Sequence, residues 1–359
     1  METLAVPEAE RVAAAVRSLE GPAAASLDAA RPVVVLDIET SGLGASLVPF
    51  MAAVAWHERG RMHLMQWTLH DGAAERAFLA DVFACLDGIL RPGTRLLSYN
   101  GKSFDLPRLR VRAQRLALGA GARGVPSLGA SHLDLVIPAR RVLKGALPNC
   151  RLSTLEAELL GHKRRGDMGG MEIAELWERM ASTPGLADAL AGESDHDEDD
   201  DALDPFLRED LAAAQLHNRG DVWALCSVAT AVAQRLERPQ SLAEAMGAAN
   251  HLRQIEAPAA AIEVLHAFVE EASPVRPVWV DAALLLADLH RSEGQHGSAA
   301  ALWRRVCKAA PGHLGAHESL AKHLEHKERR PDLALEVARA SLAPCPKRIA
   351  RLEKKVARQ

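Results

Sequence analysis

The sequence predicts an α/β domain, in which helices flank a mixed sheet, followed by an all-α domain of helical repeats. Two observations predict this order. Up to about residue 238, short runs of β-branched and apolar residues alternate with longer segments of helical periodicity. Beyond Pro239 the strand-like runs stop, and small and large apolar residues recur at a fixed interval.

The predicted strands and helices follow each other as a meander and then as an alternation. Residues 1–30 form an Ala-rich N-terminal extension, either a short helix or a loose arm, that breaks at Gly21-Pro22. The α/β domain is expected to cover residues 31–238. Its first strands are expected at residues 32–36, 51–57 and 61–68, and the short Glu58-Arg59-Gly60 turn makes the last two antiparallel. We then expect helices at 73–89 and 106–118, strands at 95–99 and 132–136, and mainly helix from residue 152 onward.

An acidic run occupies residues 193–201. A cation site is one interpretation, but the central glycine and the terminal glutamate of a calcium loop are missing. A solvated loop whose charges repel one another is the interpretation that we adopt.

Residues 241–346 are expected to form the helical domain. A pattern of about 34 residues, typical of tetratricopeptide repeats, is carried by Ala283, Leu286, Ala287, His290, Gly294, Ala299, Trp303, Val306 and Pro311. A second copy with one inserted residue follows, and a weaker copy spans residues 246–279. Stacked helical hairpins would bury a continuous seam and could bind a protein partner, with an unrelated helical bundle as the alternative. Residues 347–359 form a basic tail.

Length and composition limit the possible functions. A chain of 359 residues is long enough for two or three domains of about 150 residues each. The formal net charge is −4, so any contact with nucleic acid must come from a local basic surface. The five cysteines include no CxxC pair, which favours reduced thiols over a disulfide framework or a zinc site. The chain has no run of about 18 apolar residues and no apolar segment near its start, so we expect a cytoplasmic protein without membrane contact.

Two acidic residues lie at the end of the first predicted strand, in the motif DIETSGL at residues 37–43. Residues i and i+2 of a strand point to the same side, so Asp37 and Glu39 project together. Adjacent carboxylates are costly unless a cation neutralises them, although an Asp-x-Glu pair alone is weak support for a metal site.

Two further motifs each add an acidic residue. In SYNGKSFD, at residues 98–105, a helix begins at Asp105, whose carboxylate could also be a helix cap. In HNRGD, at residues 217–221, His217 and Asp221 lie one turn apart on a helix face, which could also be an ordinary surface contact.

In this order, the three motifs resemble the exonuclease motifs of the DEDD superfamily, and the chain is similar to the bacterial YprB-like ribonuclease-H-like family. Further similarity runs through residues 132–135, 151–156 and 320–326 and through Arg165 with Asp167, so that it covers about residues 31 to 345. The resemblance implies an RNase H-like fold for the mixed sheet and a tetratricopeptide-like domain after it.

The resemblance also implies phosphodiester hydrolysis by a two-metal mechanism. Two magnesium or manganese ions would be held by Asp37, Glu39, Asp105 and Asp221, with Asp37 as the bridging ligand. His217 lies where a tyrosine sits in one DEDD subclass, and it would orient or deprotonate the attacking water, because a near-neutral pKa suits that task. A neighbour of the site without a catalytic role is the alternative for His217.

Weaker candidates surround these residues. Thr40, Asn100 and Phe104 are candidates for substrate contacts, and Phe104 is either a core residue or a platform for base stacking. Asp134 and Asp167 are expected near the site but not on a metal. Three basic clusters could bind phosphates or simply form solvated helix faces: Arg108, Arg110, Arg112 and Arg115; Arg140, Arg141 and Lys144; and Lys163, Arg164 and Arg165.

The sequence therefore predicts a metal-dependent 3′–5′ exonuclease that trims single-stranded DNA or RNA ends. One alternative is a nucleic-acid-binding module that keeps the nuclease fold with little turnover and is recruited through its helical repeats. Another is internal cleavage of RNA–DNA hybrids. The choice between DNA and RNA stays open, because recognition of the 2′-hydroxyl depends on details of the pocket.

Overall fold

The structure, a computed structural model, describes residues 7–42, 47–118, 132–164, 166–191, 204–274, 277–342 and 344–358. The acidic run at 193–201 and the basic residue Arg165 lie outside these ranges. The chain divides into two compact units. The first comprises Met1–Arg140 and Asn149–Gln234, and the second comprises Arg141–Pro148 and Arg235–Gln359.

A five-stranded mixed sheet forms the centre of the first unit. Its strands are β1 (Val33–Thr40), β2 (Pro49–Glu58), β3 (Arg61–Thr68), β4 (Arg95–Ser98) and β5 (His132–Asp134), in the order β3-β2-β1-β4-β5. The first three strands pair antiparallel, whereas β4 pairs parallel with both β1 and β5. The predicted meander is thus confirmed. Its tight turn works because Arg59 and Gly60 both adopt positive φ angles, 50° and 73°, which match the twist of a two-residue hairpin.

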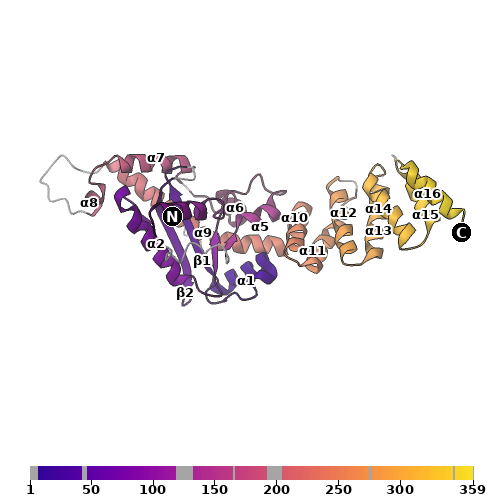
Figure 1. The fold of residues 1–359 in the computed structure, drawn as a ribbon, viewed down its shortest axis with the longest axis horizontal. Coiled ribbons are helices and arrows are strands. Elements are labelled where there is room, and N and C mark those ends of the chain that lie inside the picture. The colour runs from indigo at the N-terminus through magenta and orange to yellow at the C-terminus, as the bar shows by residue number, and fades with distance from the viewer. Residues whose placement is uncertain are drawn as a thin grey trace. The chain divides into compact units, whose positions relative to one another are not determined.

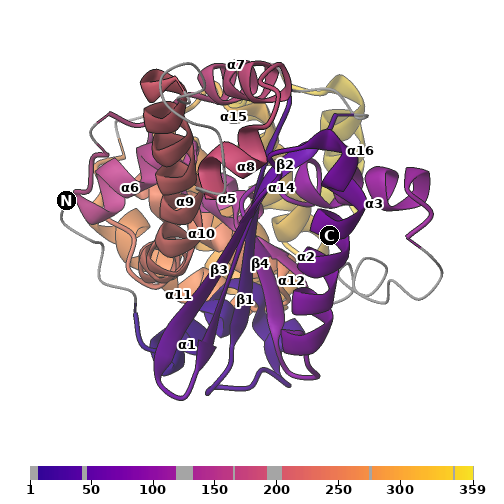
Figure 2. The ribbon, with the colours of Figure 1, turned by 90° about the vertical axis from the view of Figure 1, so that its left-hand side faces the viewer.

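Alternate residues of strand β1 point to opposite faces of the sheet. Val34, Leu36 and Ile38 are buried in one apolar cluster with residues of α2 (Glu75–Ile89), α3 (Asp105–Arg115) and α7 (Gly170–Ala181). The alternate residues Asp37 and Glu39 point to the other face, which follows from the two-residue period of a strand. That face carries the long helix α9 (Pro205–Glu237), so that α2 and α9 lie on opposite sides of the sheet (Figure 2).

In the described ranges the first unit also contains α1 (Ala9–Glu20), α6 (Leu152–Leu160), α8 (Leu186–Ala191) and most of α5 (Val136–Leu143), with short 3-10 turns at Gly21–Ala24 and Gly72–Ala74. The fifth strand is shorter than the predicted 132–136, because α5 already begins at Val136. Helix α3 ends at Arg115 rather than at the predicted residue 118, and Ala117 has a positive φ of 46° directly after it.

The second unit is helical. It contains α10 (Leu242–Gln254), α11 (Pro258–Glu271), α12 (Pro277–Ser292), α13 (His296–Ala309), α14 (Leu314–His326), α15 (Pro331–Ala340) and α16 (Pro346–Val356) (Figure 1). Each helix packs against the next along the chain. Leu286, Trp303 and Leu320 are buried, as expected for residues between neighbouring helices. The predicted helical C-terminal region is therefore confirmed.

Residues 141–148, which comprise the end of α5 and the segment after it, group with these helices rather than with the sheet. Gly247 of α10 makes this packing possible, since a Cβ there would lie 2.5 Å from the carbonyl oxygens of Arg141 and Val142. None of the helices in the described ranges is long and apolar enough to span a membrane.

Candidate active site

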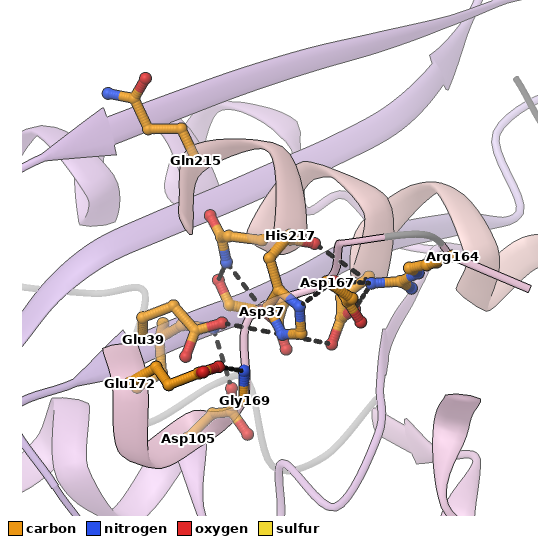
Figure 3. A network of polar contacts seen from close by, with 12 residues as sticks. Asp37, Glu39, Asp105, Arg164, Asp167, Gly169, Glu172, Gln215 and His217 are labelled. Atoms are coloured by element: carbon orange, nitrogen blue, oxygen red, sulfur yellow. Dashed lines mark hydrogen bonds and ion pairs between the residues drawn. The ribbon is translucent and has the colours of Figure 1, made fainter. Parts of the chain in front are cut away.

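Four acidic residues from three elements of the first unit act on one another electrostatically, and Figure 3 shows three of them, Asp37, Glu39 and Asp105. Asp37 and Glu39 lie at the end of β1, Asp105 is the first residue of α3, and Asp221 lies on α9. Asp105 does not cap its own helix; its Oδ1 atom accepts a hydrogen bond of 3.2 Å from the backbone N–H of Ile38. That bond ties the start of α3 to the β1 backbone between Asp37 and Glu39. The structure therefore brings together all four predicted acidic residues.

The electrostatics of the site reflect this crowding. Burial raises the pKa of Asp37 well above its ordinary value, and the charges of Asp221, Glu39 and Asp105 raise it further. Burial also raises the pKa of Glu39 to about 8, despite the opposing effect of His217. The pKa of Asp105 is raised to about 7, again chiefly by burial. The nearby positive groups of the protein therefore do not offset the burial and mutual repulsion of these carboxylates.

The donor set fits a hard divalent cation, but its atoms are engaged by protein partners. Carboxylate oxygens are the ligands that Mg²⁺ and Mn²⁺ prefer. Within the described ranges, however, no group of three or more His, Cys, Asp or Glu side chains is arranged to hold a metal ion. Asp221 forms an ion pair with Arg164, and Asp37 accepts a hydrogen bond from Asn218. A metal ion bound at Asp221 Oδ1 would therefore compete with the positive charge of Arg164.

His217 lies beside the carboxylates, one turn before Asp221 on α9. Its Nδ1 atom is 2.6 Å from Asp167 Oδ1, and its Nε2 atom lies 3.6 Å from Glu39 Oε1 and 3.9 Å from Asp221 Oδ2. Burial opposes protonation of the ring, but these three carboxylates outweigh it and raise the pKa of His217 to about 9. The sequence analysis expected a near-neutral pKa for His217. In the structure this pKa is higher, because three carboxylates lie near the ring.

Asn218 is a site residue to which the sequence analysis assigned no role. It is fully buried, and its Nδ2 atom donates to Asp37 Oδ2 at 2.7 Å. Its Oδ1 atom accepts from Gln66 Nε2 of β3 at 2.9 Å. Asparagine has a low helix propensity, so its place in the interior of a long helix was the one sign in the sequence that Asn218 has a specific role. Gln66 offers no comparable signal, since it is an ordinary polar residue on an edge strand.

Arg164 was grouped with phosphate-binding or solvated basic residues, but it is half-buried and ion-paired. Its guanidinium contacts Glu156, with Nε to Oε2 at 2.9 Å, and also contacts Asp221. It lies directly over Gly220 of α9, where a Cβ would be only 3.1 Å from Nη1. The glycine of the HNRGD motif therefore leaves room for this arginine.

Two predicted substrate residues have partners within the protein. The Thr40 hydroxyl is buried and donates to the carbonyl of Gly42 at 2.6 Å, which shapes the chain after β1. The ring of Phe104 is partly exposed, and the guanidinium of Arg108 lies 3.5 Å from its centroid. This cation–π contact covers one face of the ring. Phe104 is therefore neither a fully buried core residue nor a ring with both faces open for base stacking.

Asn100 and Asp134 form the turn that leads to Asp105. Asn100 adopts a positive φ of 67°, and its backbone N–H donates to Asp134 Oδ1 at 2.7 Å. The other oxygen of Asp134 accepts from the Lys102 N–H at 3.0 Å. Gly101 is required in this turn, because a Cβ would lie 2.2 Å from the Ser98 hydroxyl. Asp134 thus holds the turn that carries the chain from β4 to Asp105.

The other basic clusters have mixed environments. Arg112 forms an ion pair with Glu75, so it is not part of a free phosphate-binding surface. Arg140, Arg141 and Lys144 are exposed, as the interpretation of a solvated helix face requires.

Comparisons with known proteins identify the family of the domain that carries these residues. A family model described as the RNase H superfamily matches residues 34–233, a range that spans β1 to α9 and includes all four acidic residues. The chain is also 27% identical over 319 residues to the uncharacterized protein YprB of Bacillus subtilis (strain 168), which covers 86% of this chain and 68% of that protein. No solved structure matches the chain significantly.

Proposed function

Because the chain belongs to the RNase H superfamily, we propose that it is a metal-dependent 3′–5′ exonuclease of the DEDD type. Membership of the superfamily supports nuclease activity on nucleic acids. The direction of digestion, the preference for single-stranded ends and the use of two metal ions are our proposal. A protein partner bound through the helical second unit is part of it.

The observation that supports the proposal most is the environment of Asp37. Three other carboxyl groups raise its pKa, and they come from β1, α3 and α9. A protein that only needed stability would not bury like charges together without cations, because each such group costs free energy. A nuclease would keep these buried carboxyl groups because they bind the metal ions that the hydrolysis of a phosphodiester needs.

Each residue of the site has a part in the proposed reaction. Asp37, Glu39, Asp105 and Asp221 would hold two Mg²⁺ or Mn²⁺ ions. Such ions lower the pKa of water and stabilise negative charge on the phosphate. By offsetting the charges of Glu39 and Asp221, the ions would also lower the raised pKa of His217. The Nε2 atom of the neutral ring would then accept a proton from the attacking water as the water oxygen bonds to phosphorus and the bond between phosphorus and the 3′ oxygen breaks.

Cleavage assays with the full chain test the proposal. Single-stranded DNA and RNA with a 5′ label, incubated with Mg²⁺ or Mn²⁺, should shorten stepwise from the 3′ end. Circular single strands should stay intact, and Asp37→Asn should be inactive on every substrate. Internal cuts in an RNA–DNA hybrid would instead favour the endonuclease alternative.

One observation favours the binding-module alternative, namely the ion pair between Arg164 and Asp221. It occupies a carboxylate that a metal-dependent nuclease needs. If the full chain binds single strands but releases no nucleotides with either ion, and calorimetry detects no Mn²⁺ binding, the exonuclease proposal is wrong.

A further inference from the structure

We propose that Asp167 is the positioning residue for His217, because its carboxylate fixes the ring so that Nε2 faces Glu39 and Asp221. The proposal rests on the proposed nuclease function, in which His217 accepts the proton of the attacking water. It adds to the acidic quartet a fifth carboxylate that acts through the histidine rather than on a metal.

The distances single out this contact. At 2.6 Å, the separation of His217 Nδ1 from Asp167 Oδ1 is that of a strong, charge-assisted hydrogen bond. The separations of Nε2 from Glu39 and Asp221, 3.6 and 3.9 Å, are too long for hydrogen bonds. Of these three carboxylates, Asp167 alone can therefore set the orientation of the ring. A hydrogen bond at one ring nitrogen also decides which nitrogen is presented to the site.

The segment that carries Asp167 is anchored on both sides. It lies between α6 and α7, and the residues that the structure describes there have no regular secondary structure. Three residues earlier, Arg164 is held by Glu156 of α6, whose side chain is only 1% exposed. Two residues later, the N–H of Gly169 donates to Glu172 Oε2 at 2.6 Å at the start of α7 (Figure 3). These anchors keep the Asp167 carboxylate in place against His217.

A structural role for Asp167 as a partner of Arg164 is the competing explanation. The distance from Arg164 Nη1 to Asp167 Oδ1 is 3.9 Å, longer than a hydrogen bond, and Arg164 already has Glu156 and Asp221 as closer partners. The geometry therefore assigns Asp167 to the histidine.

The assignment has a direct chemical consequence. When Nδ1–H donates to Asp167, a neutral ring carries its lone pair on Nε2, the atom that faces the carboxylates. The water proton can then pass to Nε2, and the imidazolium so formed keeps its Nδ1–H bond to Asp167. A nucleophile or water, a base and a third group that orients the base form a recurring catalytic arrangement.

Activity measurements on the full chain test whether Asp167 acts through His217. Asp167→Ala should lower kcat by about 100-fold, the lower range of a general-base contribution, with little change in KM. Asp167→Asn keeps an oxygen acceptor and should lose less. In a His217→Ala background, Asp167→Ala should cause no further loss, because its only route to the reaction has been removed. Asp210→Asn is the matched control, since it removes an exposed ion pair with Arg179 that does not touch the histidine.

A spectroscopic readout tests the contact without turnover. The ¹⁵N–¹H spectrum of the metal-free protein should contain a downfield imidazole N–H resonance that is absent from His217→Ala. Asp167→Ala should remove it, whereas Asp210→Asn should keep it. The proposal is overturned if the resonance is unchanged in Asp167→Ala, or if that substitution costs the same factor with and without His217. If wild type cleaves no substrate, the nuclease function and the catalytic part of this proposal both fail, and the resonance alone decides whether Asp167 orients the ring.

Discussion

Burial raises the pKa of Asp37, and the charges of the other three acidic residues raise it further. In Asp37→Asn the side chain can still accept the hydrogen bond from Asn218, but one buried charge disappears. We expect cleavage to fall by at least about 1000-fold, since a metal ligand is lost. The metal-free variant should nevertheless be more stable than wild type, by about 1 kcal/mol, which corresponds to about 2–4 °C in Tm. Scanning calorimetry in the presence of a chelator measures this gain, and a lower Tm would contradict it.

The pH dependence of stability follows from the same carboxyl groups. Glu39 and Asp105 have pKa values of about 8 and 7, raised from their ordinary values of 4.5 and 3.8. In the folded protein they hold protons that the unfolded chain has already released, so the free energy of unfolding should fall as pH rises from about 5 to 8. The raised pKa of His217, about 9, adds a loss of the same sign from about pH 6.5 to 9.

Thermal unfolding from pH 5 to 9, with a chelator and then with Mn²⁺, measures this dependence. Without metal the Tm should decline steadily, and Glu39→Gln should make the decline shallower. Mn²⁺ should raise the Tm most at high pH, because it binds the deprotonated carboxylates. A flat metal-free profile would show that these groups do not share buried charge.

At this scale the sequence predicts the identities of the acidic residues better than their surroundings. Asp37 and Glu39 share a face because of the strand period alone, and His217 and Asp221 share one because of the helix period. The partners of these residues depend on tertiary packing. Arg164 lies 57 positions from Asp221 in the chain, and Gln66 lies 152 positions from Asn218. No local pattern could have indicated either contact.

At the scale of elements, two helical glycines should respond to alanine in opposite ways. Gly88 of α2 has no atom within 4 Å of the position that a Cβ would occupy, so Gly88→Ala should stabilise the protein by about 0.5–1 kcal/mol. Gly247 of α10 contacts the backbone of Arg141 and Val142 too closely for a Cβ. Gly247→Ala should therefore cost about 1–3 kcal/mol. Chemical denaturation of both variants measures the difference, and a gain in stability at position 247 would show that the packing is looser than described.

The same elements show where prediction from sequence stops. The strand meander was predictable, since short runs of apolar and β-branched residues and the Glu58-Arg59-Gly60 turn are local signals. The assignment of residues 141–148 to the helical unit was not, because nothing in the composition separates the last turn of α5 from the rest of that helix. Their grouping depends on a contact with α10, about a hundred positions later.

At the scale of the whole molecule, the helical unit can be tested by truncation after Arg238. Residues 141–148 would lose the helices with which they form a compact unit, and the buried side chains of Val142 and Leu143 would become exposed to solvent. Burial of such side chains contributes about 1.5–3 kcal/mol each. We therefore expect a lower yield of soluble protein and a lower Tm than for the full chain.

A double substitution in the shortened chain serves as its control. If Val142→Ser with Leu143→Ser restores soluble protein, the loss is due to this exposed segment. If the shortened chain is as stable and as active as the full one, the helical unit has no structural role and serves recruitment alone.

Helix α9 carries three of the groups that the proposed reaction needs within five consecutive residues. His217 is the proposed proton acceptor, Asn218 holds Asp37, and Asp221 is a proposed metal ligand. Since these side chains lie on one continuous helix, they move together when the helix moves. A small rotation of α9, or a shift along its axis, would misplace all three groups together, and the reverse movement would restore all three. The site is therefore expected to gain and lose competence in one step, without a state in which only one of these groups is in position.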